Sequence, residues 1–404
     1  MSFQQGLSGL NAASRSLEVI GNNVANANTV GFKQSTTVFA DVFANSLTGA
    51  GASQIGIGVK VAAVAQEYTQ GNVTSSNNPL DIAINGGGFF RLTDKGAISY
   101  SRNGQFQLDK FGYIVNANGN NLTGYTADAS GVLSTGAPDK LLINTTALPP
   151  KQSSEVGAVM NLDSRKPDMV SGGFLMSDPR TFTHASAVQI YDSLGNNHTL
   201  QTYYVKTAAS TWDVFAASDQ TLIGTGPVGT VTFDSKGALV TGSLITIPVN
   251  VTTGATTPFN VRFNMAGTTQ FGNEFGVTTL NQDGYSSGQL AGFSAAADGI
   301  IIGRYTNGKS STLGQIVLAS FTNPNGLQSL GNNAWAETAT SGQALVGTPK
   351  SGALGVLQSN ANEESNVDLT AELVDMITAQ RYYQANAQTI KTQDQVLQTL
   401  VNLR

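Results

Sequence analysis

Hydrophobic residues recur at helical spacing near both ends of this chain, and the seam near the C-terminus is the longer one. Steps of four and three residues from Leu369 follow an apolar seam that two polar residues, Gln380 and Asp394, interrupt. No glycine or proline occurs after Gly355. The spacing predicts one helix over 365–404, long enough to suggest coiled-coil-like packing. The apolar residues of this seam are Leu369, Leu373, Met376, Tyr383, Ile390, Leu397 and Val401.

A matching stripe opens the chain and predicts an N-terminal helix from Ser2. Its large apolar members are Phe3, Leu7, Leu10, Leu17, Ile20 and Val24. Glycines at positions 6, 9 and 21 weaken this helix in isolation, although small residues also allow a close approach to a partner. We expect the two terminal helices to pair, with the stripes serving as subunit-packing surfaces. The alternative is two amphipathic helices folded onto the core of one domain.

Between the helices, short β-branched and aromatic runs are broken by Asn-Gly, Asp-Gly and Gly-Gly pairs, which is typical of hairpins. The predicted fold is therefore mainly β with long terminal α-helices and nested, discontinuous β domains. Boundaries are expected near Pro149-Pro150 and near Asp283-Gly284. The predicted parts are a terminal helical segment at 1–32 and 362–404, a connector at 33–77, an inner β domain at 78–147 and 285–361, and an outer inserted β domain at 148–284.

Charge is scarce in this chain. Charged residues make up 12% of the 404 positions and the net charge is -5, so no basic surface is expected for nucleic acid. No apolar run is long enough for a transmembrane helix, and the N-terminus lacks the features of a cleaved signal peptide. Cysteine is absent. We therefore expect no nucleic-acid partner and no membrane insertion.

Catalytic and cofactor motifs are not evident in the sequence. The two histidines are His184 and His198, and the Asn196-Asn197-His198 stretch favours a solvated loop histidine over a catalytic base. The glycine run 86–88 lacks the context of a phosphate-binding loop and is interpreted as a turn. The sequence predicts no enzyme, no cofactor and no metal site.

Several motifs resemble the bacterial flagellar rod and hook protein family. The Asn-rich stretch 22–33, which ends in Gly31-Phe32-Lys33, is similar to the signature that follows the family's N-terminal helix. Residues 365–394 are similar to its C-terminal block, and shorter similarities lie at 101–106, 122–125 and 313–319. The resemblance covers both ends and the predicted inner β domain.

Within that family, rod members are shorter and lack a large outer domain, so the length of this chain favours a hook subunit. The resemblance then implies a homopolymer: a flexible tube outside the outer membrane that passes motor torque to the filament, with terminal helices lining a central channel. It also implies contacts with rod, hook-cap and hook–filament junction proteins, and export by the flagellar type III apparatus without a cleaved signal. The alternatives are a distal-rod-like axial protein and, from another class, a secreted β-rich adhesin or glycan-acting enzyme.

Two short segments have a role only through this resemblance. Asn28, Gly31, Phe32 and Lys33 would form the connector motif after the first helix. Phe39 and Phe43 resemble a short export signal of rod and hook subunits, although a core-facing helical turn would give the same pattern. The Gly/Ala-rich stretch 46–57 looks longer than in some hook relatives, which leaves the conformation of the connector open.

Overall fold

The chain forms two compact units in a computed structural model that describes residues 2–42 and 56–402. The first unit contains residues 1–144, 292–303 and 310–404, and the second contains residues 145–291 and 304–309. The predicted outer domain at 148–284 falls within the second unit, which also takes residues 145–147, 285–291 and 304–309 of the predicted inner domain; the other predicted parts fall within the first unit. The mainly β fold with paired terminal helices is confirmed.

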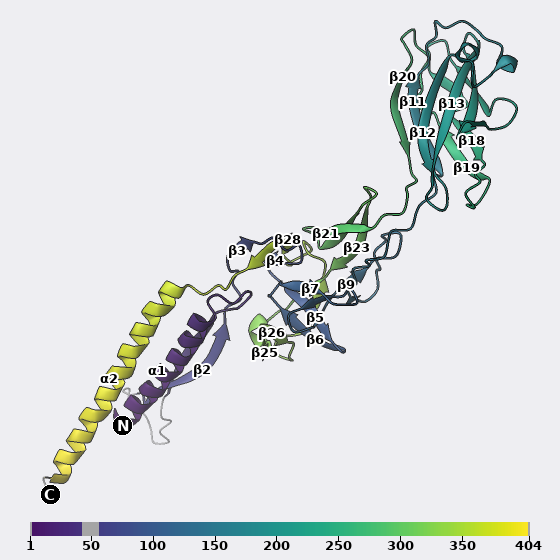
Figure 1. Ribbon diagram of the computed structural model, residues 1–404. Coiled ribbons are helices and arrows are strands. Elements are labelled where there is room, and N and C mark those ends of the chain that lie inside the picture. Colours follow the sequence, from purple (N-terminus) through teal and green to yellow (C-terminus); the bar gives the residue numbers. More distant parts are fainter. Residues whose placement is uncertain (1, 43–55, 403–404) are drawn as a thin grey trace. The chain divides into compact units, whose positions relative to one another are not determined.

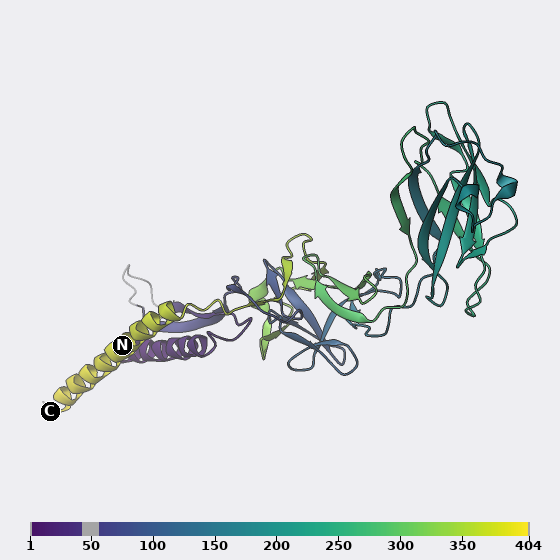
Figure 2. The same cartoon turned by 45° about the horizontal axis from the view of Figure 1, so that its top comes forward.

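The terminal helices of the first unit are α1 (Ser2–Ala25) and α2 (Leu369–Asn402). They lie side by side, together with an antiparallel hairpin of β1 (Ser35–Val42) and β2 (Gly58–Gln66) (Figures 1 and 2). This hairpin lies inside the predicted connector 33–77, and both of its strands pack on α1. The predicted helix over 365–404 begins four residues later than expected, because Ser365 to Asp368 precede α2.

The rest of the first unit is built from short strands. They are β3 (Val73–Ser75), β4 (Ile82–Asn85), β5 (Phe89–Asp94), β6 (Ala97–Ser101), β7 (Phe106–Leu108), β8 (Ile114–Asn116), β9 (Asn121–Thr126), β10 (Asp139–Lys140), β21 (Leu290–Ala295), β22 (Ile300–Tyr305), β23 (Ser310–Ile316), β24 (Leu318–Ser320), β25 (Gln328–Gly331), β26 (Ala334–Ala336), β27 (Leu345–Gly347), β28 (Val356–Ser359) and β29 (Ala361–Glu363), with a 3-10 turn η3 (Pro324–Gly326).

Most of these strands form one sheet whose main path runs β21-β22-β23-β9-β5-β6-β26-β25. Phe89, Tyr100, Phe321 and Trp335 are buried on it and meet edge to face, an arrangement that aromatic rings prefer. Two further pairings, β29 with β3 and β28 with β4, join the chain just before α2 to strands from the first hundred residues. The inner strands are therefore assembled from both halves of the sequence, and they fix where α2 begins.

The second unit is a sandwich of two sheets around one core. One sheet has the order β12-β13-β14-β16-β17, with β15 beside β14, and the other has the order β18-β19-β11-β20. Alternate residues of the strands point inward, and Trp212, Tyr204 and Phe263 are fully buried among them. The elements are β11 (Glu155–Asn161), η1 (Ser171–Gly173), η2 (Pro179–Thr181), β12 (His184–Tyr191), β13 (Asn197–Ala208), β14 (Thr211–Ser218), β15 (Thr221–Leu222), β16 (Gly229–Phe233), β17 (Leu239–Thr241), β18 (Leu244–Val249), β19 (Phe259–Asn264) and β20 (Gly276–Gln282).

Candidate assembly interface

The helices α1 and α2 form an antiparallel pair in close contact. A Cβ atom added to Gly6 would lie 3.1 Å from a side-chain carbon of Ile390, and one added to Gly9 would lie 2.6 Å from the Asn386 amide. At the other end of the pair, Asn23 contacts Glu372. Two of the three glycines that weaken α1, Gly6 and Gly9, therefore bring the two backbones together, as the small residues suggested.

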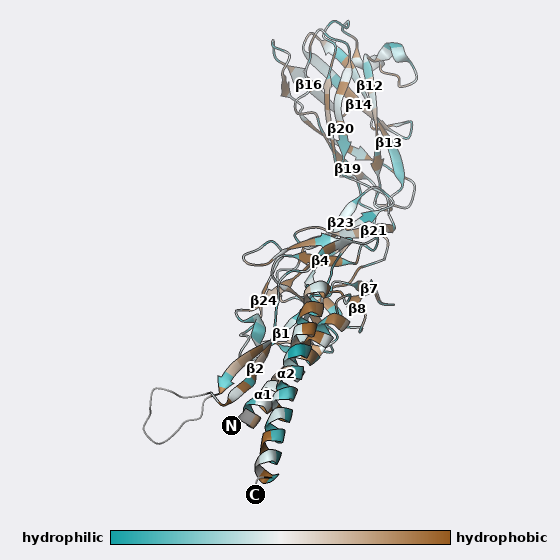
Figure 3. Cartoon of the chain, turned by 90° about the vertical axis from the view of Figure 1, so that its left-hand side faces the viewer, coloured by the Kyte–Doolittle hydropathy of each residue, from teal (hydrophilic) through white to brown (hydrophobic). Residues whose placement is uncertain are grey.

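The face of α2 that meets α1 is not centred on the predicted seam. Among the described side chains of α2, Glu372 and Ala379 are the buried ones, and Asn386 and Ile390 continue that line toward the start of α1. By contrast, the side chains of Leu369 and Leu373 are 47% and 45% exposed. Figure 3 shows hydrophobic residues interspersed with hydrophilic ones along α2. The helix therefore uses mainly small and polar residues, together with Ile390, within the subunit, and several of its apolar residues stay at its surface.

The offset has a geometric cause. Steps of four and three average 3.5 residues per turn, whereas a straight α-helix has 3.6, so a heptad seam drifts about 20° per seven residues. Between Leu369 and Val401 the drift approaches a quarter turn. The predicted seam consequently starts beside the face that meets α1 and lies on that face by Ile390.

The predicted stripe of α1 shows the same mixture of burial. Ile20 is buried, and Leu10, Leu17 and Val24 are partly buried. Phe3 and Leu7, near the start of the helix, remain exposed. On α2, Met376 and Ile390 are partly buried, and Tyr383, Leu397 and Val401 are exposed. The role of these residues in packing between subunits stays a prediction.

A polar junction closes one end of the helix pair. Asn23 accepts a hydrogen bond from the Ser35 backbone N–H, and its amide donates both to the Ser35 carbonyl and to Glu372 Oε1, at 2.8 and 2.9 Å. Gln34 donates to the same Glu372 oxygen at 2.7 Å. One asparagine thus binds the start of β1 and the first turn of α2. Sequence reasoning found the Asn-rich stretch but not this role, since the partner lies 349 positions away.

A buried ion cluster lies beyond that junction. Lys33 Nζ is 2.7 Å from Glu363 Oε1, and the two side chains are completely buried. Arg102 Nε is 3.2 Å from the other oxygen of Glu363, and its guanidinium donates to the carbonyls of Gly86 and Gly88. Burial lowers the pKa of Lys33 and of Arg102, and the Glu363 carboxylate opposes that shift in both. The cluster joins the connector, β29 and the loop before β5.

The predicted connector motif contributes Gly31 and Lys33 to this region. Gly31 has φ +71, and a Cβ atom there would lie 2.6 Å from the Asn103 backbone nitrogen, so no other residue fits without a shift. Its N–H donates to the Glu363 carbonyl at 2.8 Å. Phe32 is partly buried and Asn28 is exposed. The predicted role of the motif as a connector between helix and strands stays a prediction, and these contacts agree with it.

The two phenylalanines of the candidate export signal are only partly described. Phe39 lies in β1, so the alternative of a core-facing helical turn is wrong at this position. Its ring is exposed, which leaves the export interpretation available. Phe43 and most of the 46–57 stretch lie outside the described residues. The export role of the pair stays a prediction.

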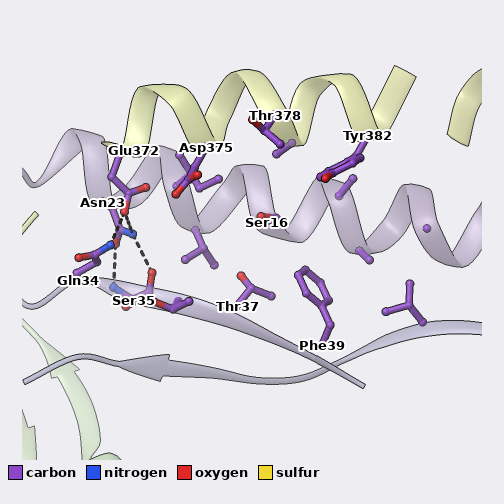
Figure 4. Close-up of a pocket in the computed structure, with 18 of the residues that line it drawn as sticks. Ser16, Asn23, Gln34, Ser35, Thr37, Phe39, Glu372, Asp375, Thr378 and Tyr382 are labelled. Carbon is purple, nitrogen blue, oxygen red and sulfur yellow. Dashed lines mark hydrogen bonds between the residues drawn. The ribbon is translucent and has the colours of Figure 1, made fainter. Parts of the chain in front are cut away.

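A groove of about 500 Å³ runs between α1, α2 and β1 (Figure 4). Small residues of α1, among them Ala12, Ala13 and Ser16, line it, and Phe39 and Tyr382 contribute aromatic rings. The polar junction of Asn23, Gln34 and Glu372 lies at one end. Among the described residues, Glu372 Oε2 and Thr37 Oγ1 are buried without a hydrogen-bond partner, and both residues line the groove.

The prediction of a solvated loop histidine at position 198 is wrong. His198 lies in β13, is 6% exposed, and contacts Asp219 through Nδ1 and Asp192 through Nε2. Burial lowers its pKa, but the hydrogen bonds to these carboxylates raise it more, so the net shift is upward. Asp192 also accepts from Thr253 at 2.6 Å. Asp192 and Asp219 come from turns that are separate in the sequence, and His198 links them through its two ring nitrogens.

The described part of the chain gives little support for a metal site or a membrane-spanning helix. No group of three or more His, Asp or Glu side chains there is arranged to hold a metal ion. Neither described helix has the length and hydropathy to cross a membrane. The strongest unexplained surface is the one formed by α1, α2 and the β1–β2 hairpin.

Sequence comparisons match family profiles along most of the chain. Residues 3–33 match the flagella basal body rod protein family, and residues 83–151 match the flagellar hook protein FlgE/F/G D1 domain. Residues 161–285 match the flagellar basal body protein FlaE D2 domain, and residues 358–403 match the flagellar basal body rod FlgEFG protein C-terminal region. The matched ranges at the two ends contain nearly all of α1 and all of α2.

Whole-chain relatives decide the family. The chain is similar to the flagellar hook protein FlgE of Salmonella typhimurium, with 44% identity over 413 residues and full coverage of both chains. It is 33% identical to the FlgE of Borreliella burgdorferi, covering all of this chain and 99% of the relative. The chain belongs to the flagellar hook protein family. It is therefore a structural subunit of the flagellar hook.

A solved structure supports the fold. The crystal structure of Helicobacter pylori flagellar hook protein FlgE2 matches 72% of this chain and all of its own, with a TM-score of 0.56 and 14% sequence identity. At that identity the match speaks for the fold alone. The confirmed parts of the sequence interpretation are thus the family, the fold class and the hook subunit.

Proposed function

We propose that this hook subunit polymerises through α1 and α2 into a flexible tube that transmits motor torque to the filament. The observation that carries the proposal is the apolar surface that the helix pair leaves uncovered: Phe3, Leu7, Leu369, Leu373 and Leu397 are all exposed. A monomer gains nothing from such a stripe, whereas a homopolymer removes it from water at every subunit contact. The described helices would line the channel with their neutral polar residues.

The partners of the subunit follow from its position in the flagellum. We propose that its main partner is further copies of itself, and that rod, hook-cap and hook–filament junction proteins contact it at the ends of the polymer or during assembly.

Export by the flagellar type III apparatus without a cleaved signal would bring the subunit outside the cell. In that scheme Phe39 and Phe43 serve as an export signal, and Phe39→Ala with Phe43→Ala lowers secretion; unchanged secretion contradicts the export role.

Substitution at Leu373 tests the polymer interface. Leu373→Asp would bury an unpaired carboxylate at the subunit contact. Leu373→Asn is the matched control, because asparagine has nearly the same shape as aspartate but carries no charge. Because Leu373 is exposed in the monomer, both variants should fold with unchanged helix and strand content by circular dichroism. We expect Leu373→Asp to abolish hook formation and Leu373→Asn to leave shorter hooks, seen by electron microscopy of cells that carry the variant in place of their own subunit.

Hooks of normal length and number with Leu373→Asp would contradict the packing role of this face. Secreted variant protein in the culture medium separates a defect in assembly from a defect in export. Complementation by the unmodified chain is the control, and its failure to produce hooks would contradict the proposed function itself.

A further inference from the structure

The helix α2 extends past the start of α1. Contacts of Gly6 with Ile390 and of Asn23 with Glu372 set an antiparallel register in which Ser2 lies near residue 394. The remaining turns of α2, residues 395–402, are about 12 Å of helix at 1.5 Å per residue. We call this segment the overhang.

The overhang carries an apolar ridge that no described part of α1 covers. Steps of seven and eleven residues return to the same side of a helix, so Leu397 and Val401 continue the line of Asn386 and Ile390. Their side chains are 50% and 73% exposed. The contact between α1 and α2 therefore ends before the apolar face of α2 does. Covering the rest of that face requires a surface from another molecule.

The groove between α1, α2 and β1 has the properties of that surface. It is lined by Gly9, Ala12, Ala13 and Ser16, whose small side chains leave room for branched apolar ones. Glu372 Oε2 and Thr37 Oγ1 point to an absent hydrogen-bonding group, since buried polar atoms are normally satisfied. The occupant must therefore bring apolar side chains together with a polar donor.

We propose that the groove receives the overhang of a second copy of this chain. The overhang offers Leu397 and Val401 for the apolar lining and the neutral amide of Asn402 as a donor for the polar end. Groove and overhang are different surfaces of one subunit, so the contact is heterologous and repeats from copy to copy, as an open helical polymer requires. The inference rests on the proposed function, because it names the contact through which the helices polymerise.

The absence of cysteine from the chain permits a direct cross-linking test. A variant with Leu397→Cys and Phe39→Cys places one thiol on the overhang and one at the groove. The matched control is Gln395→Cys with Phe39→Cys, since Gln395 lies on the opposite side of the overhang. Hooks isolated from cells that carry each variant are oxidised and run on denaturing gels without reductant.

The expected result is a ladder of dimers, trimers and longer chains for the Leu397 pair and at least tenfold less cross-linking for the Gln395 pair. Equal ladders, or intact hooks without cross-links, overturn the groove contact while leaving polymerisation through the helices standing. If a double variant forms no hooks, hooks are assembled from co-expressed single-cysteine subunits diluted with unmodified chain. A Leu397–Phe39 dimer band then supports the contact, and its absence overturns it.

Discussion

At the residue scale, the ion cluster around Glu363 is the clearest constraint on how the helices join the strands. Two cations, Lys33 and Arg102, share one carboxylate in a site almost without solvent access. Removing one partner of a buried ion pair leaves the other charge buried without compensation, whereas replacing the whole pair by apolar groups often costs little stability. The loss of stability should therefore depend on which member of the cluster is replaced.

Glu363→Gln should destabilise the first unit by about 3–5 kcal/mol, because both cations lose their counter-charge. Lys33→Met should cost less than half of that, since the Arg102–Glu363 pair survives and a long apolar side chain fills the space. Urea unfolding followed by the fluorescence of Trp335, in a Trp212→Phe background, measures both. Equal losses for the two variants would contradict the counter-ion role of Glu363.

His198 gives the second unit a dependence on pH. Both ring nitrogens face carboxylates, which requires the doubly protonated ring, and the pKa of His198 is accordingly raised. A raised pKa contributes stability that is complete below the unfolded value of about 6.5 and is lost as pH rises through the folded value. The second unit of the unmodified chain should therefore melt at progressively lower temperature as pH rises through this window.

His198→Asn removes the titrating ring and should flatten that alkaline slope, while lowering the melting temperature most at pH 6. The chain has two tryptophans, and Trp212 is the one in the second unit. Its fluorescence in a Trp335→Phe background therefore reports the unfolding of this unit alone. An identical alkaline slope in the variant would show that another group carries the effect.

At the scale of elements, the two helices were predictable and their mutual orientation was not. Period and the lack of breakers identified α1 and α2, and turn residues identified the β middle. The face of α2 that pairs with α1 escaped prediction because Glu372, Ala379 and Asn386, which lie on it, are polar or small, so the hydrophobic pattern does not mark them. The Lys33–Glu363 and His198–Asp219 contacts escaped as well, since they join residues that only the tertiary fold brings together.

Glycines in α1 divide into two kinds. Gly9 meets the Asn386 side chain, whereas a Cβ atom on Gly21 would find no described atom within 4 Å. Gly21→Leu should stabilise the helix of the monomer by about 0.5–1 kcal/mol through helix propensity alone. Gly9→Leu should instead separate α1 from α2 and lower the helical signal at 222 nm on heating. Matching thermal curves for the two variants would contradict the close packing of the helices.

At the scale of the whole molecule, the two chain segments that enter and leave the second unit are paired by a short ladder within it. Lys151 and Tyr285 exchange two backbone hydrogen bonds of 3.0 and 2.9 Å, and Leu148 pairs with Gly288 in the same way. A chain that lacks residues 152–284 can therefore be closed by an Asn-Gly turn between this pair. The polymer contacts assigned to α1 and α2 are untouched by the deletion.

The deletion variant should still assemble into tubes, because polymerisation is proposed to use the helices. We expect its curvature or stiffness to change, because the weakly charged surface of the second unit is expected to make the sliding contacts that let the tube bend. Electron microscopy of secreted, assembled hooks measures their curvature. Complete loss of assembly, with the variant secreted and its first unit folded, would contradict this division of labour.

The central claim is that the apolar faces of α1 and α2 are exposed in the subunit and become covered in the hook. Hydroxyl-radical footprinting of the unmodified chain, as secreted monomer and as isolated hooks, reads both states at single residues. The account predicts strong protection of Leu369, Leu373 and Leu397 in hooks, with little change at Phe111, an exposed residue of the inner β domain. Equal oxidation of the three leucines in monomer and hook would contradict it.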